Sequence, residues 1–224
     1  MIRLYFGLGP NPEKITLLLE ELSLEYEIVP VDTYRGQQHE PAFLRLNPNA
    51  KVPALTDGDV SLFDSTAILL HLAEAHQRFL GAPGDRPELL SWLMFVATGV
   101  GPYTGQAVHF QRVAPEPKDY AVNRYRREVE RHYRVLDGRL EGRAWIVGAD
   151  YTIVDISAWA WINRAPFALG EGALEPFPNL RRWLAAIEAR PALARAKLKN
   201  ASVPLKREFD EETLRALFPQ NFAR

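Results

Sequence analysis

Two short stretches carry residue types that could hold a small peptide. Residues 51–53 read Lys-Val-Pro at the start of a predicted strand, and residues 64–66 read Asp-Ser-Thr before an apolar helix. Because proline cannot donate a backbone hydrogen bond, Pro53 indicates an edge strand, a bulge or a special turn. Asp, Ser and Thr cap the free N–H groups of a helix start. The two stretches together predict a site for the main chain and carboxylate of a small peptide.

A tight hairpin separates these stretches. Asp57-Gly58 is a strong two-residue turn signal, and a second strand is predicted over Val60–Phe63. The helix that follows is predicted over Ala67–Ala75, where apolar residues dominate. The hairpin should therefore bring the proline and the helix start close together.

The residues before this hairpin predict a β-α-β unit. Ile2–Phe6 favours a strand, Glu13–Leu24 has helical apolar spacing, and residues 26–30 alternate as a second strand. A short helix is predicted over Pro41–Leu46. The first 80 residues should thus form a β-α-β-α-β-β-α sheet domain with parallel and antiparallel strands.

The rest of the chain predicts helices. A Gly/Pro-rich turn at 81–86 is the candidate linker between a domain at 1–80 and an all-helical domain at 87–200, with an extended tail at 201–224. Thr152 and Asp155 form the acidic version of a capping box, and we assign both to folding. The helices are predicted at Pro87–Gly99, Tyr120–Leu140, Val154–Asn163, Leu180–Ala189 and Pro191–Leu198.

Composition narrows the chemistry. The 224 residues include no cysteine, which excludes disulfides, thiolate metal sites and any mechanism that uses a protein thiol. A net charge of -1 gives no excess of positive charge that would attract nucleic acid or an anionic membrane. No apolar run approaches the roughly 20 residues of a membrane span. The N-terminus lacks a secretory signal, so we expect a cytoplasmic location. No metal cluster, phosphate loop or Ser-His-Asp arrangement stands out.

Four stretches of this chain resemble the cytosolic glutathione transferases. The resemblance implies a glutathione transferase fold, which consists of a thioredoxin-like N-terminal domain and an all-α C-terminal domain. It covers the chain to about residue 200. The stretches are Gly9-Pro10-Asn11, Asn47–Leu55, Leu62–Ile68, and the Thr152–Asp155 box followed by Ile156 and Trp159.

Further details are similar to the bacterial Nu class and to related fungal transferases. That similarity implies a homodimer that binds one or two glutathiones per subunit and reduces disulfides with glutathione thiols. In one position the chain departs from the class, because Gly9 stands where the pattern has a threonine that contacts the glutathione sulfur. The matching residues are Tyr5-Phe6, Pro10-Asn11, Lys14–Thr16, Gly36–Gln38, Gly101-Pro102, Gly105-Gln106 and His109-Phe110.

The resemblance makes Asn11 the catalytic candidate. A free thiol titrates near pH ~8.5, and a hydrogen-bond donor beside a helix N-terminus lowers that pKa. Asn11 could supply the donor, or it could simply shape the turn. Tyr5 is a rival activator, but it lies inside a predicted strand and we interpret it as a core residue.

The glutathione contacts follow from the same resemblance. The backbone of Val52 would bind the cysteinyl part, exposed by a cis Pro53; a trans-proline turn is the alternative. Asp64 would accept the γ-glutamyl ammonium and Ser65 would bind its carboxylate, and both could also be plain helix caps. Gln38 and Lys51 would contact the glycyl end, with a solvated loop charge as the alternative for Lys51.

The helical domain contributes the remaining candidates. Arg124 matches a family arginine that reaches glutathione, although an exposed arginine in a charged helix is the alternative. His109 could act as a base or be an ordinary packed residue. The expected second-substrate pocket comprises Tyr103, Gln106, His109 and Phe110.

The predicted function is a glutathione-dependent disulfide-bond oxidoreductase of the transferase family, acting through the thiolate of bound glutathione. The expected partners are glutathione, as cosubstrate without a metal, and a small disulfide or electrophile. Two alternatives remain. One is a conjugating transferase for small electrophiles, and the other is a catalytically weak glutathione-binding regulator, which Gly9 favours.

Overall fold

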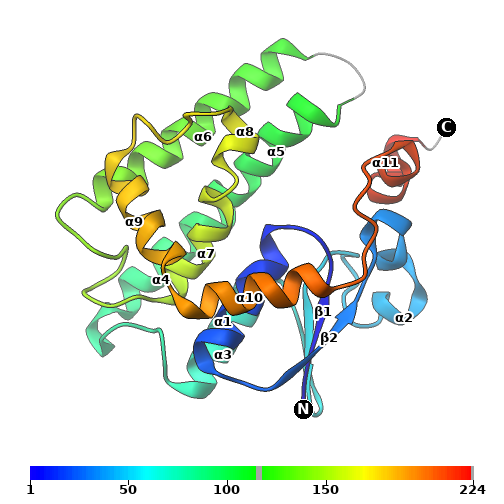
Figure 1. The fold of residues 1–224 in the computed structure, drawn as a ribbon, viewed down its shortest axis with the longest axis horizontal. Helices are drawn as coiled ribbons and strands as arrows, with labels where there is room; N and C mark the ends of the chain where they lie inside the picture. The colour runs from blue at the N-terminus through cyan, green and yellow to red at the C-terminus, as the bar shows by residue number, and fades with distance from the viewer. Residues whose placement is uncertain (115–117, 223–224) are drawn as a thin grey trace. The chain divides into compact units, whose positions relative to one another are not determined.

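The structure is a computed structural model that describes residues 1–114 and 118–222. The chain folds into two compact units (Figure 1). The first combines residues 1–71 with the residues from 194 onward, and the second comprises residues 72–193. Each unit has its own core and is described separately below.

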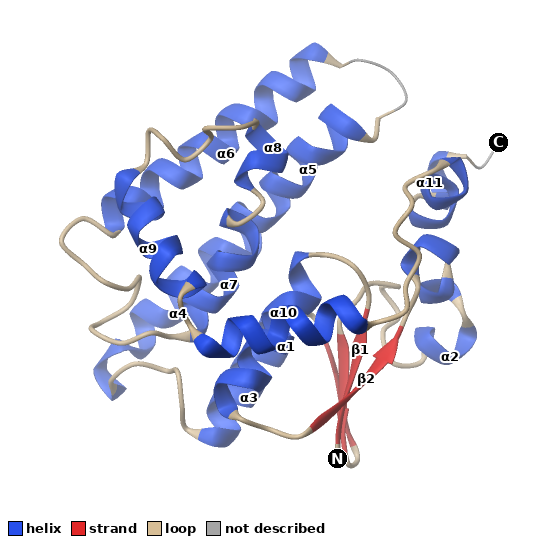
Figure 2. Ribbon diagram, viewed as in Figure 1, coloured by secondary structure: helices blue, strands red, loops and turns tan. Residues whose placement is uncertain are grey.

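A four-stranded sheet forms the centre of the first unit (Figure 2). Its order is β2-β1-β3-β4, where β1 pairs parallel with β2 and the other pairs are antiparallel. This confirms the predicted mixed sheet. The strands are β1 (Ile2–Phe6), β2 (Tyr26–Pro30), β3 (Ala54–Asp57) and β4 (Val60–Phe63).

The strand register brings three connections to one end of this sheet. Tyr5 near the end of β1 lies opposite Ala54 at the start of β3, and Ala54 lies opposite Phe63 at the end of β4. The loop after β1, the segment before β3 and the helix start after β4 therefore share one edge. This edge carries the residues from which the chemistry was predicted.

Helices cover both faces of the sheet. Figure 2 shows α2 (Pro41–Leu44) on one side and α1 (Pro10–Leu22) and α3 (Ser65–His76) on the other. Phe43 from α2 packs edge-on against Tyr5, with 6.2 Å between ring centroids, so Tyr5 belongs to the core on that side. Two short 3-10 turns, η1 (Thr33–Arg35) and η2 (Gln37–His39), precede α2.

The C-terminal residues complete the first unit. α10 (Pro191–Ser202) is tied to α1 by the buried Glu20, whose carboxylate pairs with Arg195 at 2.8 Å and with Lys199 at 2.7 Å. After α10 the chain contains α11 (Glu211–Leu217) and a 3-10 turn, η5 (Pro219–Asn221). The prediction of an extended tail was therefore wrong for this stretch, which includes a capped helix.

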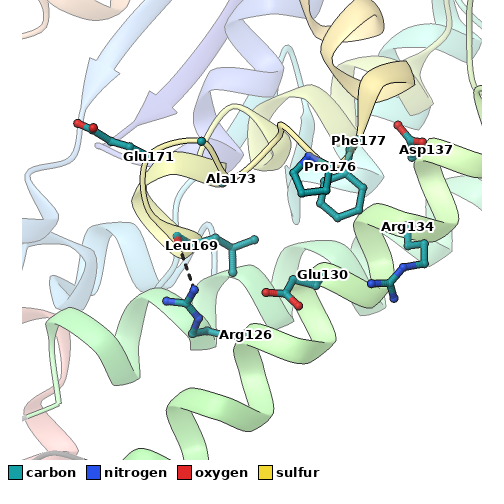
Figure 3. A pocket seen from close by; sticks show the side chains of 10 residues that line it. Arg126, Glu130, Arg134, Asp137, Leu169, Glu171, Ala173, Pro176 and Phe177 are labelled. Atoms are coloured by element: carbon teal, nitrogen blue, oxygen red, sulfur yellow. Dashed lines mark hydrogen bonds between the residues drawn. The ribbon is translucent and has the colours of Figure 1, made fainter.

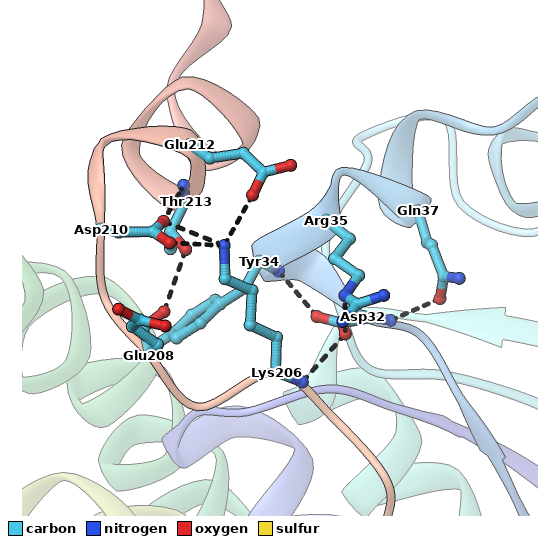
Figure 4. Close-up of polar contacts among 9 residues, drawn as sticks. All are labelled: Asp32, Tyr34, Arg35, Gln37, Lys206, Glu208, Asp210, Glu212 and Thr213. Atoms are coloured by element: carbon cyan, nitrogen blue, oxygen red, sulfur yellow. Dashed lines mark hydrogen bonds and ion pairs between the residues drawn. The ribbon is translucent and has the colours of Figure 1, made fainter.

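Polar contacts hold this last stretch beside η1 (Figure 4). The backbone N–H of Lys206 donates to Asp32 at 2.9 Å, and Asp32 also caps η1 by accepting from Tyr34 N–H. The Lys206 ammonium pairs with Asp210 and Glu212 at the start of α11. Asp32 and Lys206 thus connect the start of η1 to the segment that leads into α11.

The second unit is helical, as predicted. A long helical rod runs through α4 and a π-helical turn, η4 (Val96–Val100), into α5, and α6 packs along it (Figure 1). The shorter helices complete the core. The helices are α4 (Arg86–Phe95), α5 (Gly101–Arg112), α6 (Asp119–Arg139), α7 (Ile153–Ile162), α8 (Ala165–Leu169) and α9 (Pro178–Glu188), with a 3-10 turn η3 (Pro83–Asp85) before α4.

The helix α5 was not predicted, because Gly101, Pro102 and Gly105 are typical of a break. In the structure Pro102 lies in the first turn of α5, directly after η4, and the helical path continues through it. A Cβ on Gly101 would lie 2.8 Å from the Trp161 indole, so this glycine permits close packing rather than ending the helix.

The predicted capping box at the start of α7 is confirmed. Thr152 Oγ1 accepts from Val154 N–H, and the Asp155 carboxylate accepts from Thr152 N–H at 2.9 Å. Asp155 is fully buried and also accepts from Ile146 N–H and from the Trp183 indole. It therefore joins α7, α9 and the loop before Thr152. Across the described residues, no helix has the length and apolar character needed to cross a bilayer.

Candidate functional site

The segment before β3 presents an unpaired stretch of backbone. The Val52–Pro53 peptide is cis, as the resemblance implied, and β3 begins one residue later at Ala54. Val52 is half-buried, and neither its N–H nor its C=O has a hydrogen-bond partner among the described residues. Unpaired N–H and C=O groups of this kind can bind an added extended peptide.

Asn47 holds this segment in place and was missed in the sequence. It is 2% exposed; its amide donates to Lys51 C=O and its carbonyl accepts from Asn49 N–H at 3.0 Å. Asn47 therefore fixes the loop that leads to Val52. An asparagine in a Pro/Asn-rich loop gave no signal of this role, because such residues are common in turns.

The end of β1 approaches Val52 closely. A Cβ on Gly7 would lie 3.1 Å from Val52 Cγ2 and 2.8 Å from Val31 C=O. Glycine is therefore required where the chain leaves β1 and passes the cis proline. The same close approach places Gly7, at the start of the turn that leads to Asn11, beside the Val52 side chain.

The start of α3 lies at the same end of the sheet. Asp64 caps the helix, because its Oδ1 accepts from Thr66 N–H at 2.8 Å and from Ala67 N–H at 3.2 Å. Ser65 is 6% exposed, and within the described residues its backbone N–H has no acceptor. An unsatisfied N–H at a helix start, with the helix dipole behind it, favours an anion.

Lys14 lies beneath this helix start. It is 2% exposed, and its Nζ donates to Ser65 Oγ at 3.3 Å. Burial lowers the pKa of Lys14 to about 7, and the negative charge of Asp64 opposes that shift. The sequence showed Lys14 only as part of a family motif, since a lysine in a helix usually faces water.

Asn11 lies inside the first turn of α1, since the helix begins at Pro10 rather than at the predicted Glu13. Its side chain is half-buried and makes no hydrogen bond to the described residues. It is therefore available to a ligand, next to the positive end of the helix dipole. Gly9, the N-cap, has a φ of 143°, which L side chains rarely adopt, so this backbone suits glycine rather than threonine.

The two candidates for the glycyl end differ in their surroundings. Lys51 is exposed and its ammonium has no partner among the described residues. Gln38 is 2% exposed, and its amide donates to the Ala216 carbonyl of α11 at 2.9 Å. Its Oε1 is buried with no partner in the described structure. The C-terminal stretch thus already engages one of the two residues.

The other predicted site residues belong to the second unit. Arg124 is 51% exposed and pairs with Glu128 at 2.8 Å. On α5, Tyr103 and Phe110 contact Tyr125 of α6, and the Phe110 ring stacks on it at 5.3 Å. Gln106 is exposed between them.

His109 packs edge-on against the Phe110 ring at 5.3 Å, and burial lowers the pKa of His109. α5 and α6 therefore carry an aromatic strip that includes three of the four predicted pocket residues, while Gln106 alone is exposed there.

A cavity of about 380 Å³ also lies in the second unit, between α6 and the segment joining α8 to α9 (Figure 3). Arg126 closes one side of it by donating to the Leu169 carbonyl at 3.2 Å. None of the predicted site residues lines this cavity. In residues 1–114 and 118–222, no group of three His, Asp or Glu side chains is placed to hold a metal.

Two family comparisons cover most of the chain. Residues 1–74 match the glutathione S-transferase N-terminal domain, and residues 92–191 match the glutathione S-transferase C-terminal domain. The N-terminal match contains every predicted glutathione contact except Arg124.

Individual relatives agree with these matches. The chain is 42% identical over 207 residues to the disulfide-bond oxidoreductase YfcG of Escherichia coli (strain K12), covering 89% of this chain and 95% of that protein. A crystal structure of a glutathione transferase family member from Pseudomonas fluorescens pf-5, with two glutathione bound, is 38% identical with a TM-score of 0.83, covering 87% and 91% of the chains. The transferase URE2P6 from Phanerochaete chrysosporium, in complex with oxidized glutathione, is 36% identical with a TM-score of 0.83, covering 89% and 96%.

Proposed function

This chain belongs to the glutathione S-transferase family, and on that basis we propose that it is a glutathione-dependent disulfide reductase. The observation that carries the proposal is the unpaired backbone of Val52 at the cis-Pro53 segment. It lies at the same end of the sheet as the unpaired N–H of Ser65. A peptide with a free α-carboxylate fits this pair of features.

Glutathione would bind in an extended form along this edge. The N–H and C=O of Val52 pair with its cysteinyl residue, as in strand addition. Ser65 binds the γ-glutamyl carboxylate and Asp64 binds the adjacent ammonium, while Asp64 continues to cap α3. Lys51 binds the glycyl carboxylate, and Gln38 contacts the glycyl end once its amide leaves the Ala216 carbonyl that now covers it.

Asn11 would stabilise the glutathione sulfur as a thiolate. Its amide N–H can donate to sulfur, and the first turn of α1 adds the positive end of a helix dipole. The fraction of thiolate present near neutral pH would then rise, and thiolate is the form that attacks a disulfide. Gly9 supplies no hydroxyl, so Asn11 and nearby N–H groups carry this role.

The reaction proceeds by two exchanges between glutathione and the substrate disulfide. The first glutathione thiolate attacks one sulfur of the substrate, forms a mixed disulfide and releases the other sulfur as a thiolate. A second glutathione thiolate attacks the glutathione sulfur of the mixed disulfide, which yields oxidized glutathione and the second substrate thiolate. Two electrons pass from two glutathiones to one disulfide, and the protein, which has no cysteine, positions the thiolates.

The relatives support this choice over conjugation. YfcG is named a disulfide-bond oxidoreductase, and the Phanerochaete transferase was crystallised with oxidized glutathione, which is itself a disulfide. We further propose a Nu-like enzyme that forms a homodimer in the cytoplasm. Arg124 would reach glutathione, and Tyr103, Gln106, His109 and Phe110 would contact the second substrate.

The test measures reduction of 2-hydroxyethyl disulfide by glutathione in wild type and Asn11→Ala. We expect turnover in wild type and a loss of about 10-fold or more in kcat for Asn11→Ala, because one donor to the developing charge is removed. Asn163→Ala, far along the chain in the helical unit, is the control and should keep full activity.

Two outcomes would favour the alternative functions, a conjugating transferase or a glutathione-binding regulator. Faster turnover of aryl halides or epoxides than of disulfides would favour a conjugating transferase. Tight glutathione binding without any turnover would favour a regulator. If glutathione does not raise the thermal midpoint at all, the site assignment itself is wrong, because a ligand that binds the folded state stabilises it.

A further inference from the structure

Lys14 is a buried lysine that the mechanism above does not use. It lies among the apolar residues of α1, such as Ile15 and Leu18, with only 2% of its surface exposed. Burying a lysine is unfavourable unless the charge is compensated. One of its contacts, at 3.3 Å, is to the Ser65 hydroxyl at the start of α3. This contact connects a buried basic group to the residue proposed to bind a carboxylate.

The contact fixes the direction of hydrogen bonding at Ser65. In its protonated form Lys14 can only donate, so Ser65 Oγ accepts from it and has its own O–H left to donate. No acceptor for that O–H exists among the described residues, although Ser65 is only 6% exposed. The unpaired N–H of Ser65 is a second donor at the same point. Both donors therefore require an acceptor from outside the chain.

We propose that Lys14 is a positioning residue for the carboxylate that binds at the start of α3. By donating to Ser65 Oγ, Lys14 leaves the Ser65 O–H to donate to a ligand, and this favours a ligand group that only accepts, such as a carboxylate. This inference rests on the proposed function, in which that carboxylate belongs to the γ-glutamyl group of glutathione. Lys14 also adds a positive charge behind the hydroxyl. Asp64, the residue before α3, carries a negative charge that acts on Lys14, and its carboxylate also caps the helix.

The experiment compares two ligands that differ in one group. Glutathione is compared with γ-aminobutyryl-cysteinyl-glycine, which lacks only the γ-glutamyl α-carboxylate and keeps the amine and the thiol. Dissociation constants are measured by titration calorimetry for wild type and Lys14→Met, which has a similar length and no charge. We expect Lys14→Met to bind glutathione about 10-fold more weakly and to bind the analogue as wild type does.

Thr16→Val is the matched control. Thr16 is a fully buried polar residue of the same helix, bonded to Glu13 C=O and to Asn200 rather than to Ser65. Its replacement should leave the preference for glutathione over the analogue unchanged. Equal losses for both ligands in Lys14→Met, or no loss for either, would overturn the proposal. If wild type binds neither ligand, the proposed function fails instead.

A measurement on wild type decides the case if Lys14→Met does not fold. Burial lowers the pKa of Lys14 to about 7, so a carboxylate that binds beside Ser65 should hold Lys14 in its protonated form. Calorimetry at about pH 7.5, in buffers of different ionisation enthalpy, should show more proton uptake for glutathione than for the analogue. Identical proton uptake for the two ligands would refute the role of Lys14.

Discussion

The Asp155 carboxylate offers a sharp test of how the helical unit is held together. It is fully buried and accepts hydrogen bonds from Ile146 N–H at 3.1 Å, Thr152 N–H at 2.9 Å and the Trp183 indole at 2.8 Å. Asp155→Ala removes the acceptor and leaves these buried N–H groups without a hydrogen-bond partner, because water does not reach them. We therefore expect a large loss in the free energy of unfolding.

The size of this loss follows from the donors. Ile146 and Trp183 are fully buried, and each buried donor left unsatisfied costs about 1–3 kcal/mol. Loss of the capping contact at Thr152 adds about 0.5–2 kcal/mol. The expected total of about 2.5–8 kcal/mol is a large part of the roughly 5–15 kcal/mol that stabilises a typical protein.

The assay is urea unfolding followed by tryptophan fluorescence, because the Trp183 indole is itself one of the donors. Asp150→Ala is the control, since Asp150 is exposed and has no partner in the described part of the chain. It should shift stability by less than about 0.5 kcal/mol. A loss below about 1 kcal/mol for Asp155→Ala would refute the reasoning, because it would mean that the donors find other acceptors.

Three further outcomes are expected in the same unfolding assay. Glu20→Gln should cost about 1–3 kcal/mol, because it weakens the pairing with two half-exposed cations of α10; an unchanged midpoint would contradict this. Since the folded-state pKa of Lys14 is about 7 against an ordinary 10.5, the folded state binds fewer protons than the unfolded chain between these values. Wild type should therefore gain stability relative to Lys14→Met from about pH 7 to about pH 10, by up to about 1.4 kcal/mol per pH unit, and a flat difference would disprove the shift. Gly99→Ala should cost about 1–3 kcal/mol because its Cβ would lie 2.5 Å from His132 Nε2, whereas Gly138→Ala, with open space around it, should not destabilise.

The sequence predicted the first unit well because its signals are local. Alternation in β1, the Asp57-Gly58 turn and the capping residues at 64–66 each act over a few residues, so the order of strands and helices could be derived from them. The cis peptide at Pro53 came from the family resemblance, since trans is the usual form.

The features that were missed depend on distant partners. α5 begins with the Gly101-Pro102 pair, which is typical of a helix break, and the Trp161 indole that packs beside Gly101 comes from a distant part of the chain. The role of Lys14 depends on its contact with Ser65, which is far away in the sequence. The role of Asn47 depends on its hydrogen bond to Lys51 in the loop that it holds. α11 is an Asp-capped helix that lies beside η1, and its charged sequence gave no sign of that contact.

The return of the chain to its first unit has a consequence for protein synthesis. The ribosome makes residues 1–71 before residues 72–193, and most of α10 and all of α11 come after both. The sheet can pair early, while Glu20 and Asp32 must wait for Arg195 and for Lys206. The helical unit is therefore synthesised between the two parts of the first unit, which cannot complete these contacts until residues after 193 have been made.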